Sequence, residues 1–223
     1  MANLTGLDPA TLKRRSFIYR KLVAAGAEFA EVNGGAVAMR YPARGENETD
    51  CARRMALADL SVLPHWGLKG RGTMEWLAAQ GLAIGADSNK AYRQAGGELA
   101  AKLAPSEIFL LDSLAGTGAL PARLADAWTW AANAPRPQQG YPTPRQDSHA
   151  WFMITGVHAP EMFSKICGVD LRPAQCPVGT IAQTSIATAA VWEGLSARQW
   201  NEAQVAELQS MLLAVDIQKA GIE

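Results

Sequence analysis

The histidines and cysteines are the side chains best able to do chemistry, and their spacing limits what they can do. No two of the three histidines, His65, His149 and His158, stand at the i, i+4 spacing with which one helix presents a pair to a metal. The 3 cysteines show no C-x-x-C spacing. A disulfide framework and a local zinc site are therefore not indicated, and a metal site would need residues from distant parts of the chain.

Cys167 is the cysteine with a neighbour that could activate it. It lies near the end of an apolar, helix-like segment, and Lys165 is close by in the sequence. A lysine lowers the pKa of an exposed thiol, which would make Cys167 nucleophilic. The alternative is a buried helix cysteine that serves only in packing, and this is the commoner situation.

A run of glycines at 67, 70 and 72 suggests a phosphate loop at first sight. Its order is G-x-x-G-x-G, which differs from the dinucleotide fingerprint, and no P-loop sequence occurs. Lys69 and Arg71 could still meet an anion at the N-terminus of the following helix. The other interpretation is a tight turn with solvated charges. The acidic pairs Glu28/Glu31 and Glu202/Glu207 lack an apolar setting, so no complete catalytic set emerges.

The composition argues against a nucleic-acid partner. Lys+Arg 21 and Asp+Glu 21 give a formal net charge of zero, so no global field attracts a polyanion. Charged residues make up 19% of the chain and apolar residues 48%, with 7 Trp. This balance fits either a surface partly covered by partners or a large core. The N-terminus lacks a signal-peptide pattern and no apolar run reaches membrane-spanning length, so we expect a cytoplasmic protein.

The periodicity predicts an α+β protein. We expect a helix over 11–25, a turn and short strand within 31–41, and a polar loop over 43–50. A strand-like run at 57–69, a glycine turn and a helix over 73–79 capped by Thr73 form one unit. A strand at 150–155, a turn at Gly156 and a helix over 160–167 form a second. These two strand-turn-helix units predict a weak internal duplication.

The remaining segments complete the expected architecture. A strand is predicted at 107–111, a helix over 120–132, one or two strands within 179–192, and an amphipathic helix from Ser196 onward. The proline-rich stretch 134–147 excludes a regular helix or a central strand. We therefore divide the chain into an N-terminal half (1–133), a linker (134–147) and a second half with the C-terminal helix (148–223).

An ordered series of short motifs resembles two related families. The first part resembles the glycine-cleavage T-protein (aminomethyltransferase) family at LKRRSFIY (12–19), GAEF (26–29), GG (34–35), YP (41–42), ADLS (58–61), Gly67, KG (69–70), EWL (75–77), GG (96–97) and EIFLL (107–111). The second part is more similar to the gamma subunit of heterotetrameric sarcosine oxidase at DSHAWF (147–152), GVHAP (156–160), KIC (165–167), VDL (169–171) and AQTSI (182–186). The motifs together cover about residues 11 to 192.

This resemblance implies a folate-binding-type α+β body with two strand-turn-helix repeats. It also implies a place beside a larger subunit that oxidises small N-methylamines, in a hetero-oligomer. Flavin is then expected on the partner, tetrahydrofolate is a ligand to be tested, and no cofactor of the chain's own is expected. Two alternatives remain open: a subunit of a haem-dependent dimethylamine-oxidising complex, and a stand-alone tetrahydrofolate-binding protein.

Two departures from the family pattern point to an accessory role without an active site. The T-protein pattern has an Asp-Asp step soon after its Gly-Gly pair, whereas Gly96-Gly97 here leads to Ala100 and Ala101. The chain is also expected to lack the C-terminal barrel of a T-protein. Tryptophan is over-represented at the centres of interfaces. We therefore select Trp128, Trp130, Trp192 and Trp200 as the interface candidates.

Overall fold

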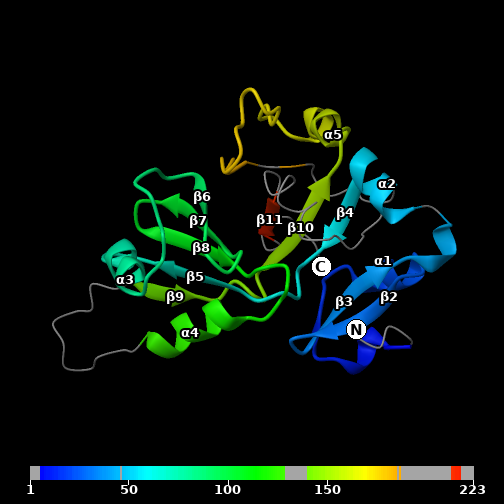
Figure 1. The fold of residues 1–223 in the computed structure, drawn as a ribbon, viewed down its shortest axis with the longest axis horizontal. Helices are drawn as coiled ribbons and strands as arrows, with labels where there is room; N and C mark the ends of the chain where they lie inside the picture. Colours follow the sequence, from blue (N-terminus) through cyan, green and yellow to red (C-terminus); the bar gives the residue numbers. More distant parts are fainter. Residues whose placement is uncertain (1–5, 46, 129–139, 185, 187–211, 217–223) are drawn as a thin grey trace. The chain divides into compact units, whose positions relative to one another are not determined.

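The structure is a computed structural model that describes residues 6–45, 47–128, 140–184, 186 and 212–216. The chain forms two compact units (Figure 1). Unit 1 contains Met1–Val62, Ser148–Val178 and Thr184–Glu223, and unit 2 contains Leu63–Asp147 and Gly179–Gln183. The predicted second half also begins at residue 148, and the first part of the predicted linker, 134–139, lies outside the described residues. The predicted halves remain a prediction.

Unit 1 begins with a three-stranded sheet in the order β1 (Arg14–Arg15), β3 (Gly35–Arg40) and β2 (Glu28–Val32). β2 and β3 form an antiparallel hairpin. Its turn residues, Asn33 and Gly34, have φ of 48° and 76°. Positive φ at both central residues is what a two-residue hairpin turn requires, and Asn-Gly is the pair best suited to it.

The helix predicted over 11–25 is wrong in its first part. The segment contains a 3-10 turn η1 (Pro9–Thr11), then β1, and only then α1 (Tyr19–Ala24). Arg14 pairs with Gly35 in the sheet, and its guanidinium donates to the carbonyl oxygens of Asn33 at 3.0 Å and Val62 at 2.6 Å. These tertiary bonds hold the backbone extended where the local apolar spacing favours a helix.

The second sheet of unit 1 has the order β11 (Leu212–Asp216), β10 (His149–Thr155) and β4 (Ala56–Asp59). Both pairings are antiparallel. The strand β11 corrects the helix predicted from residue 196 for the part that is described, 212–216. Short apolar runs fit a strand or a buried helix equally well, and here pairing with β10 decides the outcome.

A helix also replaces part of the polar loop predicted over 43–50. This helix is α2 (Glu48–Arg54), and the Asn47 side chain accepts hydrogen bonds from the backbone N–H groups of Thr49 and Asp50 at its N-terminus. Asparagine is a preferred N-cap residue. The polar composition of this segment therefore led to the prediction of a loop, although its N-cap residue starts a helix.

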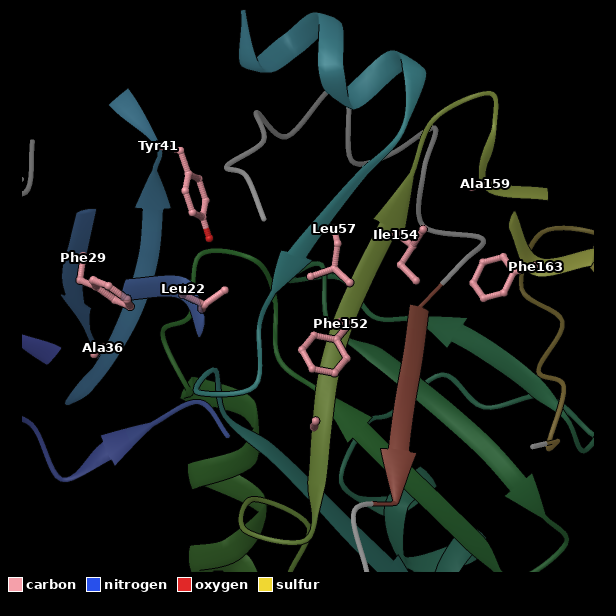
Figure 2. Packing of buried hydrophobic residues seen from close by; sticks show 10 residues of the cluster. Leu22, Phe29, Ala36, Tyr41, Leu57, Phe152, Ile154, Ala159 and Phe163 are labelled. Carbon is pink, nitrogen blue, oxygen red and sulfur yellow. The ribbon is translucent and has the colours of Figure 1, made fainter. Parts of the chain in front are cut away.

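The core of unit 1 lies against β10 and β4 (Figure 2). Phe152 and Ile154 of β10 lie beside Leu57 of β4, and Phe163 of α5 (Ala159–Ile166) packs onto the same cluster. The other buried members are Leu22, Phe29, Ala36, Tyr41, Ala150 and Ala159. The predicted strand and helix around Gly156 thus coincide with β10 and α5.

Unit 2 is built on a five-stranded antiparallel sheet. Its order is β6 (Lys90–Arg93), β7 (Leu99–Ala104), β8 (Glu107–Leu111), β5 (His65–Lys69) and β9 (Tyr141–Thr143). The strand predicted at 107–111 is confirmed as β8. The strands β6 and β7 were not predicted, and β9 occupies part of the predicted linker. Its Pro142 is tolerated because β9 lies at the edge of the sheet.

Two helices, α3 (Thr73–Ala79) and α4 (Ala119–Ala127), cover one face of the unit 2 sheet. Leu77 of α3 and Leu124 of α4 are fully buried in a core whose other members are Leu68, Leu82, Ala100, Ile108 and Leu110. The predicted cap of α3 is wrong: the N-cap is Gly72, and the Thr73 hydroxyl donates to the carbonyl of Gly70 at 2.7 Å. Gly70 and Gly156 each follow a strand and precede a helix. Whether these two units are a duplication remains a prediction.

Candidate functional site

A cleft of about 300 Å³ lies within unit 2. Three segments line it: residues 81–82 after α3, the turn 94–98 between β6 and β7, and residues 119–123 at the start of α4. Its polar side chains are Gln94, Glu98 and Arg123, and Leu82 and Leu120 provide apolar walls. Concave sites with apolar walls and a few polar groups are the usual form of small-molecule sites.

Glu98 is held in the cleft by the turn that precedes β7. The Gln94 N–H donates to the carbonyl of Glu98 at 2.8 Å, and the Gly97 N–H donates to Gln94 at 3.1 Å. The carboxylate folds over Gly96, where an added Cβ would lie 2.6 Å from Oε1. Glu98 is only 9% exposed. No group in the described part of the chain donates a hydrogen bond to its carboxylate.

Asp112 lies behind the cleft and is 2% exposed. Its Oδ2 accepts the backbone N–H of Gly118, the N-cap of α4, at 2.7 Å. Burial raises the pKa of Asp112, backbone hydrogen bonds from Gly118 and Ser113 oppose this rise, and the charge of Glu98 adds to it. Because the negative charge of Glu98 is felt at Asp112, this part of the cleft favours a positively charged group.

The other two polar side chains of the cleft are fixed from outside it. The Gln94 amide accepts from the N–H of Ala83 and donates to the carbonyls of Ala83 and Tyr92, each at 2.9 Å. This amide therefore has little capacity left for a ligand. Arg123 is exposed on α4, and one of its terminal nitrogens donates to the carbonyl of Gln80 at 3.1 Å. A guanidinium has five donors, so it can still bind an anion.

Ala100 and Ala101 are consecutive residues of β7, an inner strand of the unit 2 sheet. Ala100 is fully buried in the apolar core beneath α3 and α4. Ala101 is 7% exposed and pairs with Phe109, so it lies on the opposite face. Neither position offers a carboxylate, and Ala100 has only apolar side chains around it in that core.

An ion network lies on the face of the unit 2 sheet that carries the Phe109 side chain. The Glu107 carboxylate accepts from Arg145 at 2.5 Å and from Lys69 at 2.8 Å. Burial alone would raise the pKa of Glu107, but the hydrogen bonds and charges of Lys69 and Arg145 outweigh it and lower that pKa. The Arg145 guanidinium also lies 5.9 Å from the centre of the Phe109 ring. Lys69, one of the two predicted anion-binding residues, is thus engaged with Glu107.

The histidines and Cys167 occupy separate places. The ring nitrogens of buried His65 lie 2.9 Å and 2.8 Å from the carbonyl oxygens of Leu63 and Arg145. Cys167 is half-buried at the C-cap of α5, and Lys165 is paired with Glu161 at 3.0 Å. Over the ranges that the structure describes, no three His, Cys, Asp or Glu side chains are grouped as a metal site would need.

Of the four interface candidates, only Trp128 lies among the described residues. It is partly buried and packs against the core of unit 2. Trp130, Trp192 and Trp200 lie outside the described residues, so their role as interface candidates stays a prediction. None of the helices in the described ranges has the length and hydrophobicity of a membrane span.

A buried carboxyl also fixes the interior of unit 1. Asp59 is 5% exposed; the Ser16 hydroxyl donates to its Oδ2, and the Ser61 N–H donates to its Oδ1 at 3.0 Å. Burial raises the pKa of Asp59 above its ordinary value of 3.8, against the lowering effect of the two serines. The folded state therefore holds this proton more tightly than the unfolded state does.

This shift predicts how stability depends on pH. The stabilisation from protonated Asp59 should be fully present below pH 3.8 and should be lost as the pH rises through the folded-state pKa. The Asp59→Asn variant cannot titrate there, so its free energy of unfolding should lack this component. Urea unfolding of both proteins at a series of pH values above 3.8 measures the difference, and Asp87→Asn, at an exposed site, serves as control. Parallel pH profiles for the wild type and Asp59→Asn would contradict the assignment.

Comparison with known proteins gives a likeness of fold. No protein family model matches the sequence, and no curated protein matches it. Among solved structures, the glycine cleavage system aminomethyltransferase T from Bartonella henselae matches with a TM-score of 0.50 and 19% identity, over 68% of this chain and 43% of that chain. The heterotetrameric sarcosine oxidase from Corynebacterium sp. U-96, in complex with pyrrole 2-carboxylate, has a TM-score of 0.49 and 20% identity, over 78% of this chain and 76% of that chain.

The described chain therefore has an α+β fold like that of aminomethyltransferase T, as the sequence resemblance implied. The match spans less than half the length of that protein. Glu98, Asp112 and Arg123 were not singled out as site residues from the sequence. A signal existed for two of them, because Glu98 directly follows a Gly-Gly turn and Asp112 directly follows the apolar strand β8.

Proposed function

We propose that the chain is an accessory, non-catalytic subunit of a complex that oxidatively demethylates small N-methylamines, in the manner of sarcosine oxidase. The observation that carries this proposal is the pair Ala100 and Ala101, buried in β7 of a fold like that of aminomethyltransferase T. These residues stand where the family pattern has carboxylates. A chain of this fold without the acid is better suited to holding a partner than to turning over folate.

The partner in this proposal is a larger subunit that carries flavin and does the chemistry. The ordered motifs in the second part of the sequence, which resemble a sarcosine oxidase gamma subunit, support a hetero-oligomer of this kind. Trp130, Trp192 and Trp200 remain the interface candidates that this role requires. Trp128 has a further role in the core of unit 2, so its replacement should also cost stability.

Co-purification tests the role. The tagged chain, expressed in its native host, should bring down a flavin-bearing protein with amine-dependent dye reduction, while the isolated chain should be colourless and inactive. A haem spectrum in the eluate would favour the dimethylamine-oxidising complex instead. A chain that brings down no partner and binds tetrahydrofolate at micromolar concentration, about −8 kcal/mol, would favour the stand-alone folate-binding protein.

Tryptophan variants sharpen this experiment. An interface anchor changed to alanine should weaken association by about 2 kcal/mol or more while leaving the melting temperature unchanged. A core tryptophan should lower the melting temperature instead, at a cost of about 3 to 5 kcal/mol of stability. If all four variants lower the melting temperature and none reduces co-elution, these tryptophans are not interface anchors.

A further inference from the structure

We propose that the cleft of unit 2 binds a small amino acid in its zwitterionic form, with the ligand's ammonium group at Glu98 and its carboxylate at Arg123. This proposal concerns a ligand of the chain itself and does not depend on the accessory-subunit role. Three observations carry it: a buried carboxylate without a hydrogen-bond donor, a cation that lines the same cleft, and the size of that cleft.

The first observation is the state of Glu98. A side chain that is 9% exposed has lost most of its hydration, and no described residue compensates by donating a hydrogen bond. A buried carboxylate without a hydrogen-bond donor is unfavourable, and a bound cation would offset that cost. The charge of Glu98 acts on a second carboxylate, Asp112, whose Oδ1 lacks a hydrogen-bond partner among the described residues. The turn wall of the cleft therefore favours a positive group.

The second observation is the opposite polarity of the α4 wall. Arg123 lines the same cleft, yet it forms no ion pair with Glu98 within the described part of the chain. The N-terminus of α4 adds positive partial charge through its backbone N–H groups. Asp112 accepts a hydrogen bond from one of them, the N–H of Gly118. Two opposite charges that line one cleft without pairing are complementary to a molecule carrying both charges.

The third observation is the size and lining of the space. About 300 Å³ lies at the lower end of small-molecule sites. Leu82 and Leu120 line the same cleft and supply apolar contact. Because Gln94 is already fully engaged, the two charges are left to orient the ligand. These features favour a small apolar side chain, as in alanine.

Titration of the full chain with L-alanine, methylammonium and acetate, followed by NMR of the backbone amides, tests the proposal. L-alanine should shift the amides of 94–98 and 119–123 together and should bind more tightly than either single-charge probe. Glu98→Gln and Arg123→Gln should each weaken L-alanine binding by about tenfold or more, since each variant loses a charge-assisted hydrogen bond to the ligand. Glu75→Gln, at an exposed position on α3, should leave it unchanged.

A second variant keeps the test decisive if Glu98→Gln fails to fold. Gly96 has an ordinary φ, and a methyl group there meets only the end of the Glu98 side chain. Gly96→Ala should therefore fold normally, displace the carboxylate and weaken L-alanine binding. The proposal is overturned if L-alanine produces no shifts at 94–98. It is equally overturned if methylammonium or acetate alone binds as tightly, or if a folded Glu98→Gln or Gly96→Ala variant retains full affinity.

Discussion

Replacing Gly156 with alanine should destabilise unit 1 by about 3 kcal/mol or more. Gly156 has φ of 104°, and an added Cβ would lie 2.4 Å from the carbonyl carbon and oxygen of Arg54 and 2.6 Å from the nitrogen of Met55. These are backbone atoms, so no side-chain movement relieves the contact. The turn must then shift, which breaks the bonds from Val157 N–H to Arg53 at 2.8 Å and from His158 N–H to Arg54 at 3.0 Å.

Two other glycines of unit 1 separate the causes of this effect. Gly26 has φ of 80° and open space around its Cβ position, so Gly26→Ala measures the cost of positive φ alone, about 1 kcal/mol. Gly168 has neither a positive φ nor a close neighbour, so Gly168→Ala should change little. Urea unfolding of all three variants gives the free energies. If Gly156→Ala lowers the free energy of unfolding by no more than Gly26→Ala does, the turn after β10 does not pack closely against the end of α2.

Replacing Ala100 with aspartate should destabilise unit 2 by about 3 kcal/mol or more, because it buries a carboxylate without a partner. Ala100 is 0% exposed and lies in a core formed by Leu68, Leu110 and the other apolar residues of its cluster. This substitution brings back one of the acids that the T-protein pattern has in this region. It should nevertheless give a less stable protein with no gain in tetrahydrofolate binding.

Two other alanines provide the controls. Ala86→Asp adds the same charge at an exposed position of unit 2 outside the cleft lining and should be nearly neutral. Ala101→Asp places it on the face of Phe109, over which the Arg145 guanidinium lies, and should cost less than Ala100→Asp. Thermal melting and calorimetry with tetrahydrofolate measure both quantities. A stable Ala100→Asp variant that binds tetrahydrofolate would show that only the acid had been missing.

In the elements that were predicted correctly from the sequence, the local sequence signal and the tertiary contacts favour the same secondary structure. β8 and β10 each contain an uninterrupted apolar run, and α5 has proline in its first turn. The missed elements depend on partners far away in the chain. The sequence of β7 is rich in alanine and gives no strand signal, and the strand forms because β6 and β8 pair with it on either side. The sequence around β11 favours a helix, and pairing with β10 makes it a strand.

The site was harder to predict than the fold, for a similar reason. Glu98, Asp112 and Arg123 lie on a turn, after a strand and on a helix, so no short motif joins them. The sequence did show alanines, Ala100 and Ala101, where the T-protein pattern has acids. It could not show that Gly96 makes room for a different carboxylate two residues further on.

The order of strands in the sheet β11-β10-β4 has a consequence for how the chain is made. β4 leaves the ribosome early, but its partner β10 follows about ninety residues later, and β11 emerges later still. The strands of the unit 2 sheet all lie between His65 and Thr143. Because synthesis is slow compared with folding, that sheet can close while β4 still has an unpaired edge. A nascent chain stalled after Thr143 should therefore protect β7 from proteases but leave β4 open to chaperones.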